Sequence, residues 1–303
     1  MKRKGFWVLI QSKNESIMKP ARIMLLCLLV GVAQGCSTAA STGKMTFNLF
    51  EYNRGFSFPN RSDVLITTGA GETRFHDVRL EGSSFYPDNS IIPNAFIKPL
   101  LNLHFGDAFK AFTEPYYGIR FFHFFKSHPH WGIGIDFIHL KVFMADPGQK
   151  VSVTGPWPDV PPDGQILLKD HFATLNVSHG VNHVTFSGIY RWMLLPSAKI
   201  PDGRLQPFIS LGAGPAVPHL QLTLNRDGQS QRKAYSYNWR FGNWGMGAGA
   251  GLRWKISPKF GLYGEYKWTY SILDEMHFDN GEEGRVRMRF PTHHLVWGMS
   301  LVF

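Results

Sequence analysis

The chain is short of cysteine, of charge and of long apolar runs. Its two cysteines, Cys27 and Cys36, both lie near the N-terminus of a 303-residue chain, so a disulfide framework is excluded. Charged residues make up 18% of the chain, below the usual quarter, whereas aromatic residues make up 15%. After residue 35, no apolar run reaches the roughly 18 residues that a membrane-spanning helix requires. The composition suits a protein at a boundary between apolar and aqueous phases.

Motifs for nucleotide and nucleic-acid binding are also missing. The chain has no glycine-rich helix turn of the dinucleotide-binding type and no haem-attachment cysteines, so we expect no nucleotide cofactor. It has no basic, aromatic-interleaved module for nucleic acid either. Part of the net charge of +10 belongs to the N-terminal segment. The positive remainder suits an anionic surface such as phosphorylated lipid.

The N-terminal segment has the pattern of a secretory signal. A basic stretch that begins at Met18 precedes the apolar run 23–32, and small residues for cleavage follow. We therefore expect residues 1–35 to be a signal peptide, with Met18 as an alternative start, and residues 36–303 to form a single domain. Lipid attachment at Cys36 is disfavoured because the residues before it fit a lipidation box poorly.

Segments of period-two alternation recur through the rest of the chain, which indicates strands with two different faces. In 260–272, aromatic and aliphatic residues share one face, while Glu265 and Lys267 share the other. In 243–256, apolar residues alternate with glycines, which leave room on the inward face of a narrow barrel. The alternation in 291–303 continues to Phe303, the last residue. We interpret Phe303 as an outward-facing residue of a closing strand, where the barrel assembly machinery would engage it.

The alternation predicts an all-β fold, an eight-stranded antiparallel transmembrane β-barrel of the outer membrane, expected to be monomeric. The predicted strands are 64–76, 116–125, 131–144, 173–193, 207–224, 241–256, 260–275 and 291–303. The first is the weakest, because 46–58 could replace it. Short turns at 126–130, 194–206 and 257–259 would face the periplasm, and longer loops at 77–115, 145–172, 225–240 and 276–290 would lie outside. This asymmetry is typical of outer-membrane barrels.

Three of these strands change the parity of their apolar residues, and each change has a histidine at or near it. The histidines are His139, His179 or His183, and His219. A parity change is what a β-bulge produces, and bulges gather at barrel rims and beside active sites. We expect these imidazoles to meet near the outer end of the lumen, where they could bind a metal or move protons. Half-apolar rings at the rim with a purely structural role are the alternative.

Two other groups admit a chemical and a structural interpretation. Glu265 and Lys267 both face the predicted lumen beside Arg253 and Lys255, where charges must be paired, so a salt-bridged plug is favoured over a general base or metal ligand. The pair Ser178 and His179 suggests a hydrolase. Neighbours on a strand point apart, however, so we expect no side-chain hydrogen bond between them without a bulge.

Several stretches resemble the outer-membrane lipid A oxidase family of rhizobia. They are "PYYGIRF" (115–121), "WGIGIDFIHLKVF" (131–143), "HGVNHVTFSGIYRW" (179–192), "PFISLGAGPAVPHLQL" (207–222) and "GLYGEYKWTYS" (261–271). Each is only a barrel strand, and their order and spacing carry the resemblance. It implies an enzyme that oxidises the proximal glucosamine of lipid A, within lipopolysaccharide, to 2-aminogluconate, with molecular oxygen as co-substrate.

The positions that match these stretches and carry useful chemistry overlap the rim histidines. We expect catalytic roles for His139, His179, Glu265 and Lys267, substrate contacts from Lys141, Asn182 and Tyr270, and metal binding by His139, His179 and His219. Because oxygen reacts slowly with closed-shell organic molecules, a metal or an organic cofactor is expected, and a divalent metal on the histidines is the simplest option. A non-enzymatic structural or adhesion barrel and a lipid A deacylase are the alternatives.

Overall fold

The computed structural model describes residues 47–82 and 116–303, apart from residues 162, 227 and 282. The predicted signal peptide 1–35 and most of the predicted loop 77–115 lie outside the described residues. The described part is built of strands β1 to β17 and one short helix, α4 (Leu168–His171). No helix in this part is long and apolar enough to span a membrane.

Eight of the strands pair side by side in an order that returns to its start. They are β1 (Asn48–Pro59), β5 (Tyr117–Phe124), β6 (Trp131–His139), β11 (His183–Arg191), β12 (Leu205–Pro215), β15 (Asn243–Lys255), β16 (Phe260–Phe278) and β17 (Gly284–Val302). Each pairs antiparallel with the next, and β17 pairs with β1. The backbones of Asn48 and Phe303 exchange two hydrogen bonds of 3.2 and 3.1 Å, so the last residue takes part in this closure.

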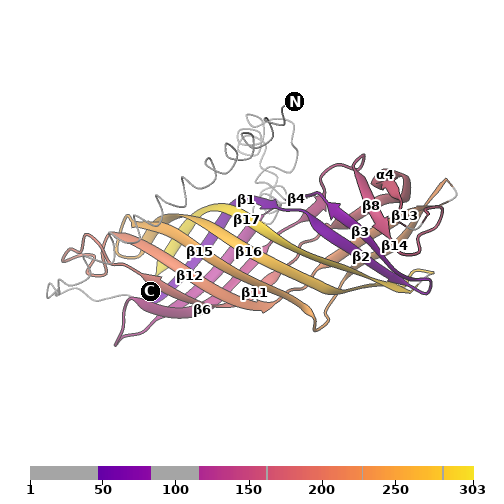
Figure 1. Ribbon diagram of the computed structural model, residues 1–303. Coiled ribbons are helices and arrows are strands. Elements are labelled where there is room, and N and C mark those ends of the chain that lie inside the picture. The colour runs from indigo at the N-terminus through magenta and orange to yellow at the C-terminus, as the bar shows by residue number, and fades with distance from the viewer. Residues whose placement is uncertain (1–46, 83–115, 162, 227, 282) are drawn as a thin grey trace, which may run out of the picture. The chain divides into compact units, whose positions relative to one another are not determined.

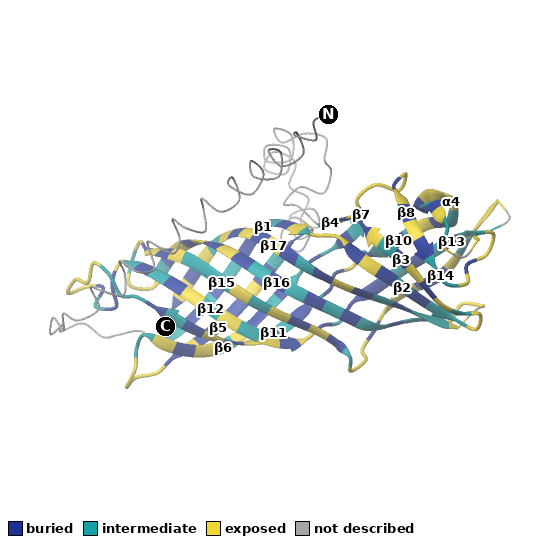
Figure 2. Ribbon diagram, viewed as in Figure 1, coloured by how far each residue is buried: buried dark blue, intermediate teal, exposed yellow. Residues whose placement is uncertain are grey.

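The two faces of these strands differ in the way that the alternation predicts. Buried and exposed residues alternate along β6, β11, β12 and β15 (Figure 2). Large apolar side chains face outward and remain exposed, for example Ile133 at 57%, Phe186 at 65% and Leu211 at 71%. The opposite face carries buried charged residues. Glycines on this face make room for them, because a Cβ on Gly249 would lie 2.1 Å from Oε1 of Glu265.

The remaining strands extend the structure at the end away from the C-terminus (Figure 1). The edge of β17 pairs with β1 over one length and with β2 over the next, and β2 continues the large sheet into β3, β8 and β9. A second, five-stranded sheet has the order β14, β13, β10, β7, β4. The bounds are β2 (Ser62–Thr68), β3 (Gly71–Val78), β4 (Leu80–Gly82), β7 (Val142–Met144), β8 (Lys150–Thr154), β9 (Gln165–Leu167), β10 (Phe172–Val177), β13 (His219–Arg226) and β14 (Gln229–Tyr237).

The main apolar core lies in this extension rather than in the part near the C-terminus. It joins residues of the large sheet, such as Ile66 and Phe290, to residues of the five-stranded sheet, such as Leu175 and Leu222. A smaller apolar cluster around Phe122 and Phe208 lies among the buried charges of the ring. The interior is therefore apolar in the extension and largely charged inside the ring of eight strands.

Two parts of the predicted topology are wrong. Residues 64–76 are not the first strand of the ring: they form most of the hairpin β2–β3, and β1 occupies the alternative segment near 46–58. The predicted loops 145–172, 225–240 and 276–290 contain strands β8, β9 and β14, the last residues of β16 and the first residues of β17. These segments are strands because they pair with one another beyond the ring.

Candidate functional site

At three neighbouring points, which we call the crossings, the chain passes between a strand of the ring and a strand of the five-stranded sheet. The crossings lie between β6 and β7 at 140–141, between β10 and β11 at 178–182, and between β12 and β13 at 216–218. They are adjacent because β11 pairs with both β6 and β12, and β10 pairs with both β7 and β13. The three predicted parity changes fall at these crossings, where a chain passes from one sheet to the other.

The middle crossing is a tight turn that Asn182 holds together. Gly180 and Asn182 both adopt positive φ, 94° and 53°, a region that glycine and asparagine tolerate. The Asn182 amide nitrogen donates to the carbonyls of His179, Gly180 and Val217 at 3.2, 3.1 and 3.0 Å. Its amide oxygen is thereby left to accept a hydrogen bond from another side chain.

That hydrogen bond comes from His139, whose Nδ1 lies 2.7 Å from the Asn182 oxygen. Because the oxygen can only accept, Nδ1 carries the hydrogen, and in the neutral ring Nε2 is the basic nitrogen. The ring of His139 stacks on Tyr117 with centroids 4.9 Å apart and lies against Gly180. The site therefore holds His139 in one tautomer and one orientation.

His179 and His219 form a second pair of imidazoles at the same crossings. Their ring centroids are 4.3 Å apart, and Tyr235 Oη lies 3.2 Å from Nε2 of His179. The rings of Tyr235 and Tyr237 pack edge-on against His219 at 4.7 and 4.6 Å. Burial among these rings, with His179 beside it, lowers the pKa of His219, so the ring is neutral near pH 7.

His139 lies on the outer face of the wall and not in the lumen, in contrast to the sequence-based expectation, while His179 is exposed and His219 is buried. His139 has the same parity along β6 as the exposed Ile133 and Ile135, whereas Asp136 points inward. His183, in contrast, is lumenal: it is 1% exposed, and its Nε2 lies 3.2 Å from Ser271 Oγ. The parity changes at the crossings explain this difference, since a single-residue shift moves a side chain to the opposite face.

Metal binding by His139, His179 and His219 stays a prediction, and the contacts of the three rings bear on it. Among the described residues, no group of three histidine, cysteine, aspartate or glutamate side chains is placed to hold an ion. Both ring nitrogens of His179 are engaged, by Ser178 Oγ at 3.2 Å and by Tyr235, and Nδ1 of His139 is bound to Asn182. Nδ1 of His219 is buried and has no hydrogen-bond partner among the residues that the structure describes. The arrangement is better suited to holding and moving protons.

Glu265 and Lys267 belong to an ion-pair network inside the ring. Glu265 accepts a hydrogen bond of 2.7 Å from Arg120, and Lys267 donates to Asp136. The neighbours predicted for them pair elsewhere: Arg253 binds Glu51 and Lys255 binds Asp202, each at 2.8 Å. This arrangement agrees with a salt-bridged interior, and it commits both predicted catalytic side chains to ion pairs inside the ring.

The structure separates the other predicted substrate contacts. Lys141 is half-buried at the crossing between β6 and β7, close in sequence to His139. Tyr270 lies on the outward face of β16, where its ring stacks on Trp268 with centroids 6.3 Å apart. Asn182 has the structural role described above. Of these three residues, Asn182 is thus in direct contact with an imidazole of the crossings.

Some features of the site were missed at the level of sequence. Tyr235 and Tyr237 lie on β14, which we predicted to be a loop, although their spacing by two was a strand signal. Ser178 and His179 make a side-chain hydrogen bond of 3.2 Å, which we did not expect on a regular strand. They can do so because residues 178–182 form a turn, where neighbouring side chains need not point to opposite faces.

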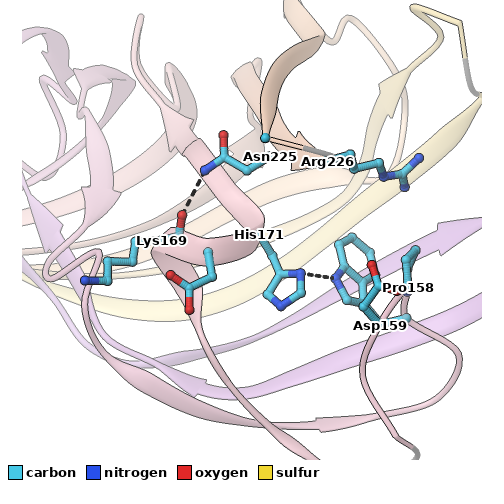
Figure 3. Close-up of a pocket in the computed structure, with 9 residues that line it drawn as sticks. Pro158, Asp159, Lys169, His171, Asn225 and Arg226 are labelled. Atoms are coloured by element: carbon cyan, nitrogen blue, oxygen red, sulfur yellow. Dashed lines mark hydrogen bonds between the residues drawn. The ribbon is translucent and has the colours of Figure 1, made fainter.

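A separate hollow of about 470 Å³ opens in the extension, between α4, the segment after β8 and the turn between β13 and β14. Figure 3 shows its hydrogen bonds, from Trp157 to His171 at 3.3 Å and from Asn225 to the carbonyl of Lys169 at 2.8 Å. Basic side chains such as Lys169 and acidic ones such as Asp159 line it together. The mixed charge selects no ligand, so the crossings remain the candidate site.

No protein-family model matches the chain, and no curated protein sequence matches it. Solved structures with a similar arrangement include the outer membrane protease OmpT from Escherichia coli, with 8% identity, 87% of this chain and 100% of that chain covered, and a TM-score of 0.41. Neisserial surface protein A has 9% identity, coverages of 84% and 97%, and a TM-score of 0.32. The outer membrane protein AlkL has 11% identity, coverages of 89% and 96%, and a TM-score of 0.36.

At these low values the likenesses define neither the family nor the activity of this chain. Its class follows from its own pairing and burial: an all-β protein in which antiparallel strands return on themselves, with an apolar outer face and a charged interior.

Proposed function

We propose that the chain is an integral protein of the outer membrane, in which the eight strands of the ring form a transmembrane barrel. The exposed outward side chains support this: Trp131, Ile133, Phe186, Leu211, Trp244, Trp297 and Leu301 are each at least 43% exposed. Such a surface is unfavourable in water and favourable in lipid. A closed ring also leaves no strand edge without backbone partners, as a lipid environment requires.

The short turns indicate which end of the barrel faces the periplasm. The turns after β5, β11 and β15 lie at the same end as Asn48 and Phe303, the two ends of the ring's chain. Outer-membrane barrels have short turns on the periplasmic side and longer segments outside. The five-stranded sheet and the imidazole crossings therefore lie at the outer surface, where lipid A is the principal lipid.

We further propose that the chain oxidises the proximal glucosamine of lipid A to 2-aminogluconate. The observation that supports this is the placement of His139 and the exposed His179 on the outer side of the wall, directly beyond its exposed apolar residues, with the buried His219 ring 4.3 Å from His179. A water-soluble substrate would favour a site in a lumen or an open cleft. A lipid headgroup, in contrast, approaches such a site sideways from the membrane.

The imidazoles suit the proton transfers of this reaction. The lactol at the reducing end loses two electrons and two protons to molecular oxygen, and water then opens the resulting lactone to the carboxylate. Nε2 of His139, whose tautomer Asn182 fixes, is the base that we assign to the lactol proton. Glu265 is committed to Arg120 inside the barrel, so a histidine is the better base. The transfer of electrons to oxygen calls for a bound cofactor.

Mass spectrometry of lipid A from cells that express the protein tests this function. We expect a gain equal to one oxygen atom in aerobic cells only. His139→Gln and His219→Gln should abolish the gain, whereas His123→Gln, an exposed histidine at the opposite end of β5, should not. Unmodified lipid A in aerobic cells containing folded protein would refute the proposal and favour a structural barrel.

The hydrogen bond between Ser178 and His179 favours a second candidate, a lipid A deacylase. His179 lies between Ser178 Oγ and Tyr235 Oη, both at 3.2 Å, in the order nucleophile, base and orienting group that an acyl hydrolase uses. This function predicts the loss of an acyl chain from lipid A, in air or without it, and Ser178→Ala should prevent the loss. The same mass spectra separate the two candidates.

A further inference from the structure

The loop between β14 and β15 exposes two large apolar side chains on either side of an arginine. Trp239 is 78% exposed and Phe241 is 98% exposed, the highest exposure among the large apolar residues of the described chain. Arg240, between them, is exposed as well. Two bulky aromatic rings held in water in this way are unfavourable unless another surface covers them.

The loop is anchored at both ends. The Asn238 backbone donates to the carbonyl of Pro218 at 2.9 Å, and its side-chain oxygen accepts from the His277 backbone at 2.8 Å. Asn243 exchanges two hydrogen bonds with the backbone of Glu275, at 2.9 and 3.1 Å. The exposed rings are therefore presented by a fixed frame and are not part of a fraying end.

The loop lies where the apolar outer face of the barrel ends. Its last residues lead into β15, whose first outward side chains, Trp244 and Met246, are 46% and 43% exposed. In a membrane this position is the interface of the outer leaflet, where aromatic side chains are favoured. Trp239 also contacts Tyr237 with centroids 6.5 Å apart, and Tyr237 packs on His219. A continuous row of rings thus connects the loop to the imidazoles.

The charges beside these rings select the occupant. Arg240 lies between Trp239 and Phe241 in the sequence, and on the adjoining strand β14 the guanidinium of Arg232 lies 5.4 Å from the centre of the Tyr235 ring. Guanidinium groups bind phosphate through paired hydrogen bonds, and aromatic faces cover the apolar face of a sugar ring. A phosphorylated sugar that is anchored in the outer leaflet would satisfy both groups at once.

We propose that Trp239, Arg240 and Phe241 form a binding surface for the phosphorylated sugar headgroup of an outer-leaflet glycolipid and guide it to His179 and His219. The inference rests on the proposed function for the identity of this lipid as lipid A. The surface itself is a binding site and has no part in the chemical step.

A fluorescence titration of the full chain tests the surface without reference to activity. Cys27 and Cys36 are replaced by serine, and an environment-sensitive dye is attached at Ser236→Cys, an exposed position next to Tyr237. The protein is placed in phosphatidylcholine nanodiscs with increasing lipid A, and in parallel with phosphatidylglycerol as an anionic lipid without sugar. We expect a saturable response to lipid A only.

Arg240→Glu should weaken the response at least about tenfold, the loss of one charge-assisted contact. The double variant Trp239→Ser/Phe241→Ser should also weaken it, because the aromatic faces that cover the sugar ring are removed. Arg61→Glu, at an exposed position elsewhere, is the matched control and should leave it unchanged. An equal response to phosphatidylglycerol, or an unaltered response in both loop variants, would overturn the inference. If the titration shows saturable binding of lipid A but the mass of lipid A from cells is unchanged, the proposed oxidation is refuted and the binding surface is not.

Discussion

Arg120 is the residue on which the charged interior depends most. It is fully buried and bridges two carboxylates, Glu51 at 2.6 Å and Glu265 at 2.7 Å. Its guanidinium also lies 4.8 Å from the centre of the Tyr263 ring and 5.5 Å from that of Phe208. Two buried carboxylates would lose a common partner if this one side chain were removed.

We therefore expect Arg120→Met to lower the free energy of unfolding by about 3–5 kcal/mol, because it leaves buried carboxylates uncompensated. Urea unfolding in detergent, followed by the mobility of the folded form on gels, measures the change. Arg61→Met is the control: its ion pair with Asp77 is 54% and 61% exposed and should contribute less than about 1 kcal/mol. Equal effects of the two substitutions would show that the interior network does not stabilise the fold.

His219 makes the crossings sensitive to acid. Its pKa is lowered by burial and by His179, so the folded state favours the neutral ring more than the unfolded state does. The stabilisation is present above the unfolded pKa of about 6.5 and is lost as the pH falls below it. We expect the contact between His179 and His219 to open under mildly acidic conditions, which NMR of labelled histidine rings would detect. His219→Gln should remove this dependence, and His123→Gln should preserve it.

At the scale of elements, the turn 178–182 positions the imidazoles. A side chain at Gly180 would be strained, since its φ is +94°, and its Cβ would lie 2.6 Å from the His139 ring. Gly180→Ala should therefore displace His139 and cost about 1–3 kcal/mol of stability. The effect on lipid A modification should be at least as large as that of removing the Asn182 hydrogen bonds.

Two substitutions of Asn182 separate its backbone role from its hydrogen bonds. Asn182→Gly keeps the positive φ of 53° but loses the bond to His139. Asn182→Ala loses both. We expect both variants to lose most of the lipid A modification, and only the alanine variant to lose additional thermal stability. If the glycine variant retains full activity, Asn182 does not set the tautomer of His139.

The alternation of apolar residues was enough to predict seven of the ring strands, because one face of each meets an apolar phase. β1 was missed in favour of 64–76 because its outward face includes Arg54 and its sequence alternates less clearly. The parity changes located the crossings, yet they could not show which face each imidazole takes. That depends on how three chains pass between two sheets, a non-local pairing that one strand's sequence does not contain.

The extension was the least predictable element, for a related reason. Segments with proline and charge, such as 145–172, have the composition of loops, and their short strands exist only because β3, β17 and the neighbouring hairpins offer edges to pair with. Tyr235 and Tyr237 are part of the candidate site through this pairing alone. The row of rings from His179 to Trp239 is consequently a property of the assembled sheet.

At the scale of the whole molecule, the proposed barrel depends on the closure between β1 and β17. Asn48 and Phe303 exchange two backbone hydrogen bonds, so the adjacent pair, Leu49 and Val302, is a non-hydrogen-bonded pair with Cα atoms about 4.5 Å apart. That separation lies within the range of a disulfide. Both side chains point into the interior, 1% and 5% exposed.

In a chain without Cys27 and Cys36, Leu49→Cys/Val302→Cys should therefore form a disulfide in the folded protein. The bond joins the two ends of the ring's chain, so the unfolded, unreduced protein should migrate as a compact species on a gel and return to normal mobility on reduction. Leu49→Cys/Val296→Cys is the matched control, because Val296 pairs with Gly55 and lies several residues away along the same strand. Equal cross-linking of the two variants, or none in the first, would mean that β1 and β17 do not close the ring in this register, and the transmembrane barrel would then lose its physical basis.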